Sequence, residues 1–127
     1  MTDADRPTNG GTPGLRKAPV LSVERADYHC IVRLAGELDL YNAPAVREAL
    51  IDACADHPKR VIVDLSEVEF IDSTALGVLI EARAKIPDRN GFLLAGPRLE
   101  TRRALEISGL DRHFSVHQTI EDALAAS

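Results

Sequence analysis

The chain has 127 residues, of which 45% are hydrophobic and 28% are charged. This size fits one compact domain with a short additional segment. The net charge of −5 and the lack of a Lys/Arg run argue against nucleic-acid binding. Because no apolar stretch approaches the ~20 residues that cross a bilayer, and residues 1–5 do not resemble a secretory signal, we expect a cytoplasmic protein without direct membrane contact.

The two cysteines, Cys30 and Cys54, are spaced neither as a zinc knuckle nor as a redox pair. Cys30 falls in a strand-like run and Cys54 on the apolar face of a predicted helix, so we interpret both as small buried side chains in a reducing compartment. Among the four histidines, only His113 and His117 share a helical spacing, and a strand is predicted between them. The sequence therefore predicts neither a metal site nor a cofactor.

Residues 1–19 differ in composition from the rest of the chain. Glycine and proline recur there and apolar residues are almost absent, so we expect a disordered N-terminal tail. The remaining residues, 20–127, are expected to form one folded domain.

Within this domain, some segments have the every-second-residue apolar spacing of strands, and others have the three-to-four-residue apolar spacing of helices. Strands are predicted at 20–23, 28–34, 60–65, 92–95 and 114–116. Helices are predicted at 43–56, 73–86, 97–109 and 119–126. Asn42 is suited to cap the first helix, and residues 36–39 are expected to leave the sheet before it. Because strands alternate with helices after an opening hairpin, we predict an α/β fold with a mixed, mostly parallel sheet of about five strands and about four helices.

Asp72, Ser73 and Thr74 lie where the apolar strand 60–65 gives way to the second predicted helix. Free backbone N–H groups and the helix dipole favour anionic oxygens at a helix N-terminus, so an exposed hydroxyl there suits a bound or attached phosphate. The same residues also suit a simple helix cap. This segment, taken alone, leaves both interpretations open.

The common motifs for phosphate binding and for serine nucleophiles are missing from the sequence. It contains neither G-x-x-x-x-G-K-[ST] nor G-x-G-x-x-G, and Ser73 lacks the flanking glycines of a nucleophile elbow. No histidine lies in the Ser73 loop, and a serine without a base is a poor nucleophile. We therefore predict that the protein is not an enzyme, whereas a second protein that brings its own base can still act on Ser73.

Three segments, in this order, resemble the anti-sigma factor antagonist family, which is built on the STAS domain. They are Gly36–Asp39 with the following Ala43-Pro44, Val61–Leu65 with Phe70–Gly77, and Ser108–Leu110. The resemblance covers about residues 20–126 and implies a single STAS-like domain. One departure is Ala75, which stands where the family usually has glycine.

The resemblance implies a partner-switching function. In this family the antagonist binds an anti-sigma factor that is also a serine kinase, and a sigma factor is released. The kinase phosphorylates the serine that follows the aspartate and thereby inactivates the antagonist, and a phosphatase restores it. By position the phosphoacceptor is Ser73, with Thr74 as a secondary candidate. The predicted partner-binding residues are Glu37, Asp39, Tyr41, Asp72, Ser73, Thr74, Ala75 and Leu76.

Two further points accompany this prediction. A phosphate adds a charge of about −1.5 to −2, and we expect it to block partner binding without refolding the domain.

The alternative function is that of a STAS adaptor or a nucleotide-sensing subunit in a stress-signalling or membrane-transport complex. Neither the oligomeric state nor the cognate partners follow from the sequence.

Overall fold

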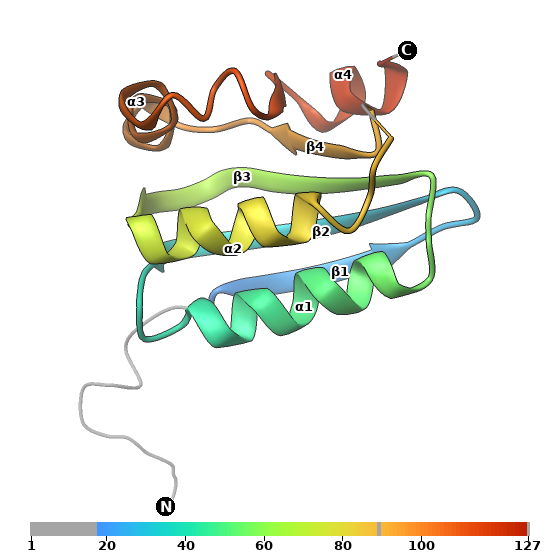
Figure 1. The fold of residues 1–127 in the computed structure, drawn as a ribbon, viewed down its shortest axis with the longest axis horizontal. Helices are drawn as coiled ribbons and strands as arrows, with labels where there is room; N and C mark the ends of the chain where they lie inside the picture. The colour runs from blue at the N-terminus through green and yellow to red at the C-terminus, as the bar shows by residue number, and fades with distance from the viewer. Residues whose placement is uncertain (1–17, 89, 127) are drawn as a thin grey trace, which may run out of the picture.

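A computed structural model describes residues 18–88 and 90–126. It contains a five-stranded sheet in the order β1-β2-β3-β4-β5. The strands are β1 (Val20–Arg25), β2 (His29–Leu38), β3 (Arg60–Ile71), β4 (Phe92–Ala95) and β5 (Ser115–His117). β1 is antiparallel to β2, whereas the other neighbours are parallel, so the predicted mixed sheet is confirmed (Figure 1). The predicted tail lies outside the described residues except for its last two positions.

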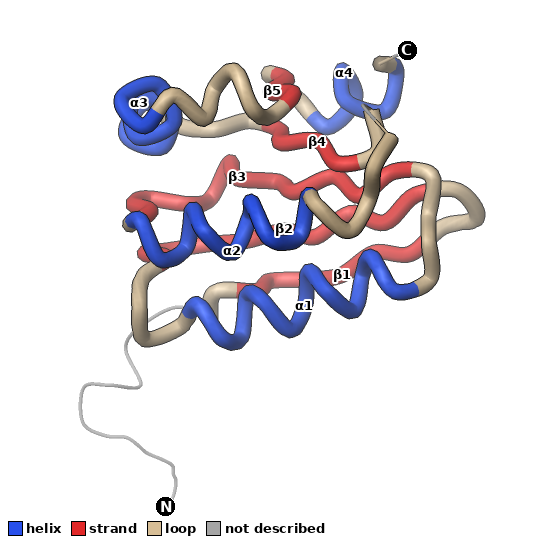
Figure 2. The backbone as a smooth tube through the Cα atoms, viewed as in Figure 1, coloured by secondary structure: helices blue, strands red, loops and turns tan. Residues whose placement is uncertain are grey.

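Four helices accompany this sheet in the described residues. They are α1 (Ala43–Ala55), α2 (Ser73–Arg83), α3 (Leu99–Ser108) and α4 (Ile120–Ala125). α1 and α2 lie side by side on one face of the sheet, and both begin at the edge where β2 and β3 end (Figure 2). α4 packs against β3, β4 and β5. None of the described helices is both long enough and apolar enough to cross a membrane.

Both faces of the central strands are covered, which explains the nearly continuous apolar run in β3. Val61, Val63 and Leu65 belong to the larger core cluster, which includes the buried side chains of α1 and α2. Ile62, between them, belongs to a second cluster with Ala123 of α4. Side chains on a strand point alternately to its two faces, so only a strand covered on both sides buries consecutive residues.

β2 and β3 continue further than the sequence predicts. The expectation that residues 36–39 leave the sheet is wrong for most of this segment, because Gly36 pairs with Val68 and Leu38 with Ile71. The ladder shifts its register near Gly36, which has a left-handed φ of 77°. Glycine adopts this conformation without a steric penalty, so the strand passes through an irregular point instead of ending there.

Two predicted helix starts also differ from the structure. Asn42 precedes α1, but its side chain makes no cap hydrogen bond. Its amide instead accepts a bond from the Asp39 N–H at 2.9 Å and donates one to the Glu37 carbonyl at 2.7 Å. α3 begins at Leu99, not at 97. The predicted cap at Thr119 is confirmed, since its hydroxyl accepts a bond from the Asp122 N–H at 3.0 Å.

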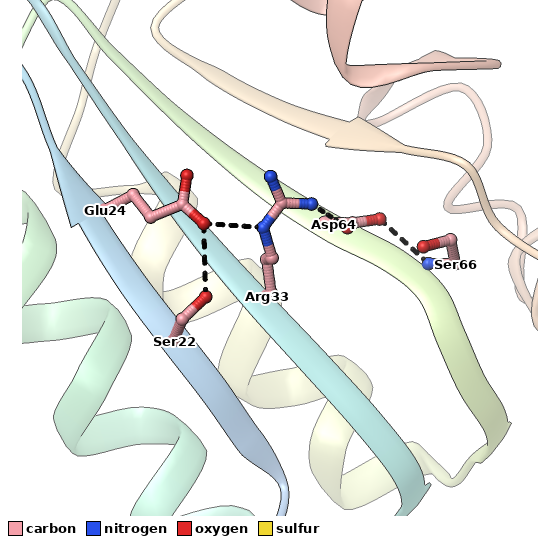
Figure 3. Close-up of polar contacts among 5 residues, drawn as sticks. All are labelled: Ser22, Glu24, Arg33, Asp64 and Ser66. Atoms are coloured by element: carbon pink, nitrogen blue, oxygen red, sulfur yellow. Dashed lines mark hydrogen bonds and ion pairs between the residues drawn. The ribbon is translucent and has the colours of Figure 1, made fainter.

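An ion network joins β1, β2 and β3 (Figure 3). Arg33 of β2 lies between two carboxylates, with Nε 2.8 Å from Glu24 Oε2 and Nη1 2.9 Å from Asp64 Oδ2. The second oxygen of Asp64 accepts a bond from the Ser66 N–H at 3.0 Å. Asp64 is thus a buried charge with both oxygens hydrogen-bonded, as a stable fold requires.

The predicted burial of both cysteines is confirmed. Cys30 is 2% exposed and Cys54 3% exposed, and both thiols are free. Burial raises the pKa of each thiol above its ordinary value, which disfavours the reactive thiolate. Both residues therefore act as core side chains.

Candidate functional site

Asp72 caps the start of α2 and also contacts the loop that precedes α1. Its Oδ1 accepts a hydrogen bond from the Ala75 N–H at 2.9 Å, which satisfies one of the free donors at the helix start. Its Oδ2 accepts a bond from the Leu40 N–H at 3.1 Å. The Asp72 N–H in turn donates to the Leu38 carbonyl at 3.0 Å. One residue therefore joins the start of α2 to the end of β2 and its loop.

Asp39 organises this loop from within. Its Oδ1 accepts bonds from the Tyr41 N–H at 3.0 Å and the Asn42 N–H at 3.3 Å. Carboxylates commonly bond the backbone two or three residues ahead in this way, and such bonds define a compact turn. Asp39 thus shapes the loop, while Leu40 brings that loop against the residue next to Ser73.

Ser73 is the first residue of α2 and is exposed. Its hydroxyl makes no hydrogen bond within the described part of the chain. The capping role and the predicted phosphoacceptor role therefore belong to different residues. Asp72 caps the helix, and the Ser73 hydroxyl remains accessible. Thr74 follows on the same exposed helix start.

The other predicted residues divide into exposed and buried groups. Glu37 and Tyr41 are exposed, Tyr41 at 84%, and Asp39 and Asp72 are half-buried. Ala75 and Leu76, by contrast, are only 1% and 7% exposed and belong to the core. The side chains of these last two residues support the site from below and present almost no surface to a partner.

The burial of Ala75 also bears on its departure from the family pattern. The methyl group of Ala75 lies in the hydrophobic core, and the Ala75 N–H is engaged by Asp72. Alanine favours a helical position over glycine. The extra methyl therefore adds to the packing of α2 and does not alter the surface around Ser73.

Two exposed apolar residues at this edge were missed by the sequence analysis. Leu40 is 62% exposed and Phe70 is 51% exposed. Together with Tyr41 they form what we call the edge patch. Phe70 pairs with Glu37 in the β2–β3 ladder, and Leu40 bonds to Asp72, so all three residues lie where β2 and β3 end. Phe70 is adjacent to Ile71, which is buried, and the sequence does not show which of these two apolar residues faces outward.

Neither a metal-ligand cluster nor the two hollows described next involve the predicted site residues within the described part of the chain. Among the described residues, no group of three or more His, Cys, Asp or Glu side chains could hold a metal. One hollow of about 200 Å³ opens at the opposite edge of the sheet near Tyr28 and His57. Another, of about 320 Å³, lies beside Arg33 and Asp64. None of the predicted site residues lines either hollow.

Comparisons with known proteins agree with this fold. A sequence model of the STAS domain matches residues 20–123. The anti-sigma-F factor antagonist RsfB of Mycobacterium tuberculosis is 35% identical over 106 residues, which are 82% of this chain and 87% of RsfB. An anti-sigma-B factor antagonist of Listeria monocytogenes is 39% identical over 88 residues, covering 68% of this chain and 77% of the relative.

A solved structure shows the same similarity in three dimensions. The crystal structure of an anti-sigma factor antagonist from Mycobacterium paratuberculosis superposes with a TM-score of 0.76 at 36% identity, covering 84% of this chain and 90% of that one. The chain therefore belongs to the STAS domain family. Its relatives named above are anti-sigma factor antagonists, which are regulatory proteins and not enzymes.

Proposed function

We propose that this protein is an anti-sigma factor antagonist whose binding to an anti-sigma factor with serine kinase activity releases a sigma factor. Phosphorylation of Ser73 switches the antagonist off, and a phosphatase that acts on phospho-Ser73 restores it. The observation that carries the proposal is the free, exposed hydroxyl of Ser73 at the first position of α2. Because the proposed partners control RNA polymerase, we expect this activity in the cytoplasm.

The Ser73 hydroxyl has the access that phosphoryl transfer needs. Its oxygen attacks the γ-phosphorus of ATP bound to the kinase, the bond to the β–γ bridging oxygen breaks, ADP leaves, and a base of the kinase takes the hydroxyl proton. Positioning in line with the leaving group dominates such reactions. The cap by Asp72 orders the first turn of α2, and this fixes the backbone from which the Ser73 hydroxyl projects.

The same position explains how a phosphate stops binding. The helix start favours the added charge, whereas Asp72 opposes it, so the fold itself is little affected. A partner packed over Ser73 must instead accommodate the bulk and desolvate a doubly charged group. The proposed contact surface consists of the Ser73 turn, Glu37 and the edge patch.

The first test compares three forms of the full chain: wild type, Ser73→Ala and Ser73→Glu. Each is used to recover partners from cells of the source organism, and partners and phosphosites are identified by mass spectrometry. Thr74→Ala serves as the matched control on the neighbouring hydroxyl. We expect an anti-sigma kinase with wild type, Ser73→Ala and Thr74→Ala, its loss with Ser73→Glu, and phosphate on Ser73.

A different result would support the alternative function. If all forms recover the same partners and Ser73 stays unmodified, the phosphorylation switch is wrong. The chain would then be a constitutive STAS adaptor in a signalling or transport complex. Magnesium-dependent binding of ATP or GTP in isothermal titration would favour a nucleotide-sensing subunit instead.

A further inference from the structure

The hollow of about 320 Å³ beside Arg33 and Asp64 lies where two neighbouring strands send the chain to opposite faces of the sheet. β4 and β5 are parallel, so their carboxyl ends meet at one edge. After β4 the chain enters α3, whose Leu105 packs into the larger core cluster with α1 and α2. After β5 it enters α4, whose Ala123 belongs to the cluster on the other face. Parallel sheets bind small molecules at such points, because the two departing loops leave a crevice between them.

The register of the sheet defines the floor of this hollow. Asp64 of β3 pairs with Arg33 of β2 on one side and with Ala95 of β4 on the other. β4 ends at this row, whereas β3 continues beyond it. Ser66 points to the same face as Asp64, because it lies two residues further along the strand. A Cβ at Gly96, the first residue after β4, would lie 3.3 Å from the Cβ of Ser66, so the loop approaches β3 closely.

Polar groups in the wall of the hollow have hydrogen-bonding capacity left. Arg33 uses Nε for Glu24 and Nη1 for Asp64, and its Nη2 bonds no described residue (Figure 3). The exposed side chains of Ser66 and Glu121 also line the hollow and make no hydrogen bond within residues 18–88 and 90–126. The hollow therefore offers a guanidinium donor, a hydroxyl and a carboxylate acceptor to a ligand.

These groups decide which ligand chemistry suits the hollow. An anion would gain the one guanidinium of Arg33, but it would face the carboxylates of Asp64 and Glu121 and that of Glu24 behind them. An ammonium group has no acceptor to offer to Arg33 Nη2. A hydroxyl group can accept a hydrogen bond from Arg33 and donate one to Glu121. Neutral ligands with several hydroxyl groups therefore match the hollow better than ions of either sign.

We propose that this hollow binds a neutral polyhydroxylated ligand of the size of one sugar ring. Its hydroxyl groups bond Arg33 Nη2, the Ser66 hydroxyl and the Glu121 carboxylate. A volume of about 320 Å³ is at the lower end of the roughly 300–1,000 Å³ of small-molecule sites, which suits a single ring. The hollow lies on the α4 face of the sheet, whereas Ser73 begins α2 on the other face, so this site does not depend on the proposed function.

The test follows the backbone amide resonances of the isotope-labelled full chain during titration with D-ribose, D-glucose and myo-inositol. Acetate and ethylammonium are the charged comparison probes. We expect at least one neutral probe to shift the amides of Gly96, Gln118 and Thr119, which line the hollow. The charged probes should leave these resonances unshifted.

Two variants at Ser66 locate the binding. Ser66→Ala removes a hydroxyl from the hollow without adding bulk, and Ser66→Val also narrows the hollow. The loss of one hydrogen bond should raise Kd about tenfold in Ser66→Ala, and Kd should rise further in Ser66→Val. Ser22→Val is the matched control, because Ser22 pairs with Arg33 across the β1–β2 ladder but does not line the hollow. Urea denaturation verifies that each variant is folded.

Four results would overturn the proposal. Unshifted resonances with all three neutral probes would mean that the hollow holds only water. Shifts confined to the hollow near Tyr28 and His57 would place the binding elsewhere. An equal Kd in wild type and both Ser66 variants would remove Ser66 and its hollow from the site. Tighter binding of acetate or ethylammonium than of the neutral probes would contradict the ligand class. None of these results bears on the proposed function at Ser73.

Discussion

Asp64 and Asp72 both lie on the segment that runs from β3 into α2, but the structure stabilises their carboxylates in different ways. Asp64 is 6% exposed and pairs with Arg33, which also pairs with Glu24. Asp72 is half-buried and accepts bonds from the backbone of Leu40 and Ala75. No cation within residues 18–88 and 90–126 pairs with it.

This difference separates a structural region from a candidate binding region. In the sheet, the protein supplies the counter-charge itself, as a buried carboxylate requires. At the start of α2, backbone N–H groups hold the carboxylate, and the adjacent hydroxyl and apolar side chains remain exposed. Changes in the sheet network should therefore affect stability, whereas changes beside Ser73 should affect binding as well.

Arg33→Met should have the largest effect on stability. It leaves the buried carboxylate of Asp64 without its cation, so we expect the free energy of unfolding to fall by about 2–3 kcal/mol. Urea denaturation at neutral pH measures this. Arg33→Lys is the matched control, because it keeps the charge but loses the paired geometry of the guanidinium. No loss of stability in Arg33→Met would mean that water satisfies Asp64.

Asp72→Ala should come next and should also impair binding. The loss of a helix cap costs about 1–2 kcal/mol, and the loop at Leu40 loses its anchor. Asp72→Ser separates the two roles, because its hydroxyl can still cap α2 but cannot at the same time reach Leu40. We expect Asp72→Ser to recover most of the stability in urea denaturation but not the affinity for the partner. Full recovery of both would show that the link to the loop is unimportant.

The ion pair between Arg47 and Glu81 should have a smaller effect. Its atoms approach to 2.6 Å, but the two side chains are 53% and 39% exposed. Exposed pairs contribute about 0.2–1 kcal/mol, and salt screens them. A double-mutant cycle with Arg47→Gln and Glu81→Gln should give a coupling energy in this range that shrinks in 1 M salt. A coupling as large as that of Arg33 and Asp64 would remove the distinction between exposed and buried charges.

The smallest effect concerns Glu24 and is seen only in acid. The hydrogen bond from Arg33 is the main cause that lowers the pKa of Glu24 below its ordinary value of 4.5. A carboxylate with a lowered pKa stabilises the fold above its ordinary pKa, and this contribution is lost as the pH falls through the lowered value. Below about pH 4.5, Tm should therefore fall more steeply in wild type than in Glu24→Gln. Identical slopes would show that Arg33 does not hold Glu24 in solution.

Much of the fold was predictable because local patterns decide it. The alternation of strands and helices, the strand 92–95 and the cap at Thr119 all follow from residues close together in the chain. The ends of β2 and β3 do not, because each of these strands continues only where the other provides a partner for its backbone. Asn42 was misjudged for a related reason, since its side chain bonds to Asp39 and Glu37 and not to the helix.

The sequence by itself determined the family pattern and the position of Ser73 at a helix start, because both depend on the order of neighbouring residues. Only the tertiary structure decided which side chains face outward. It buries Ala75 and Leu76 and exposes Leu40 and Phe70. Burial is set by what packs against each residue from distant parts of the chain, and no local pattern contains that information.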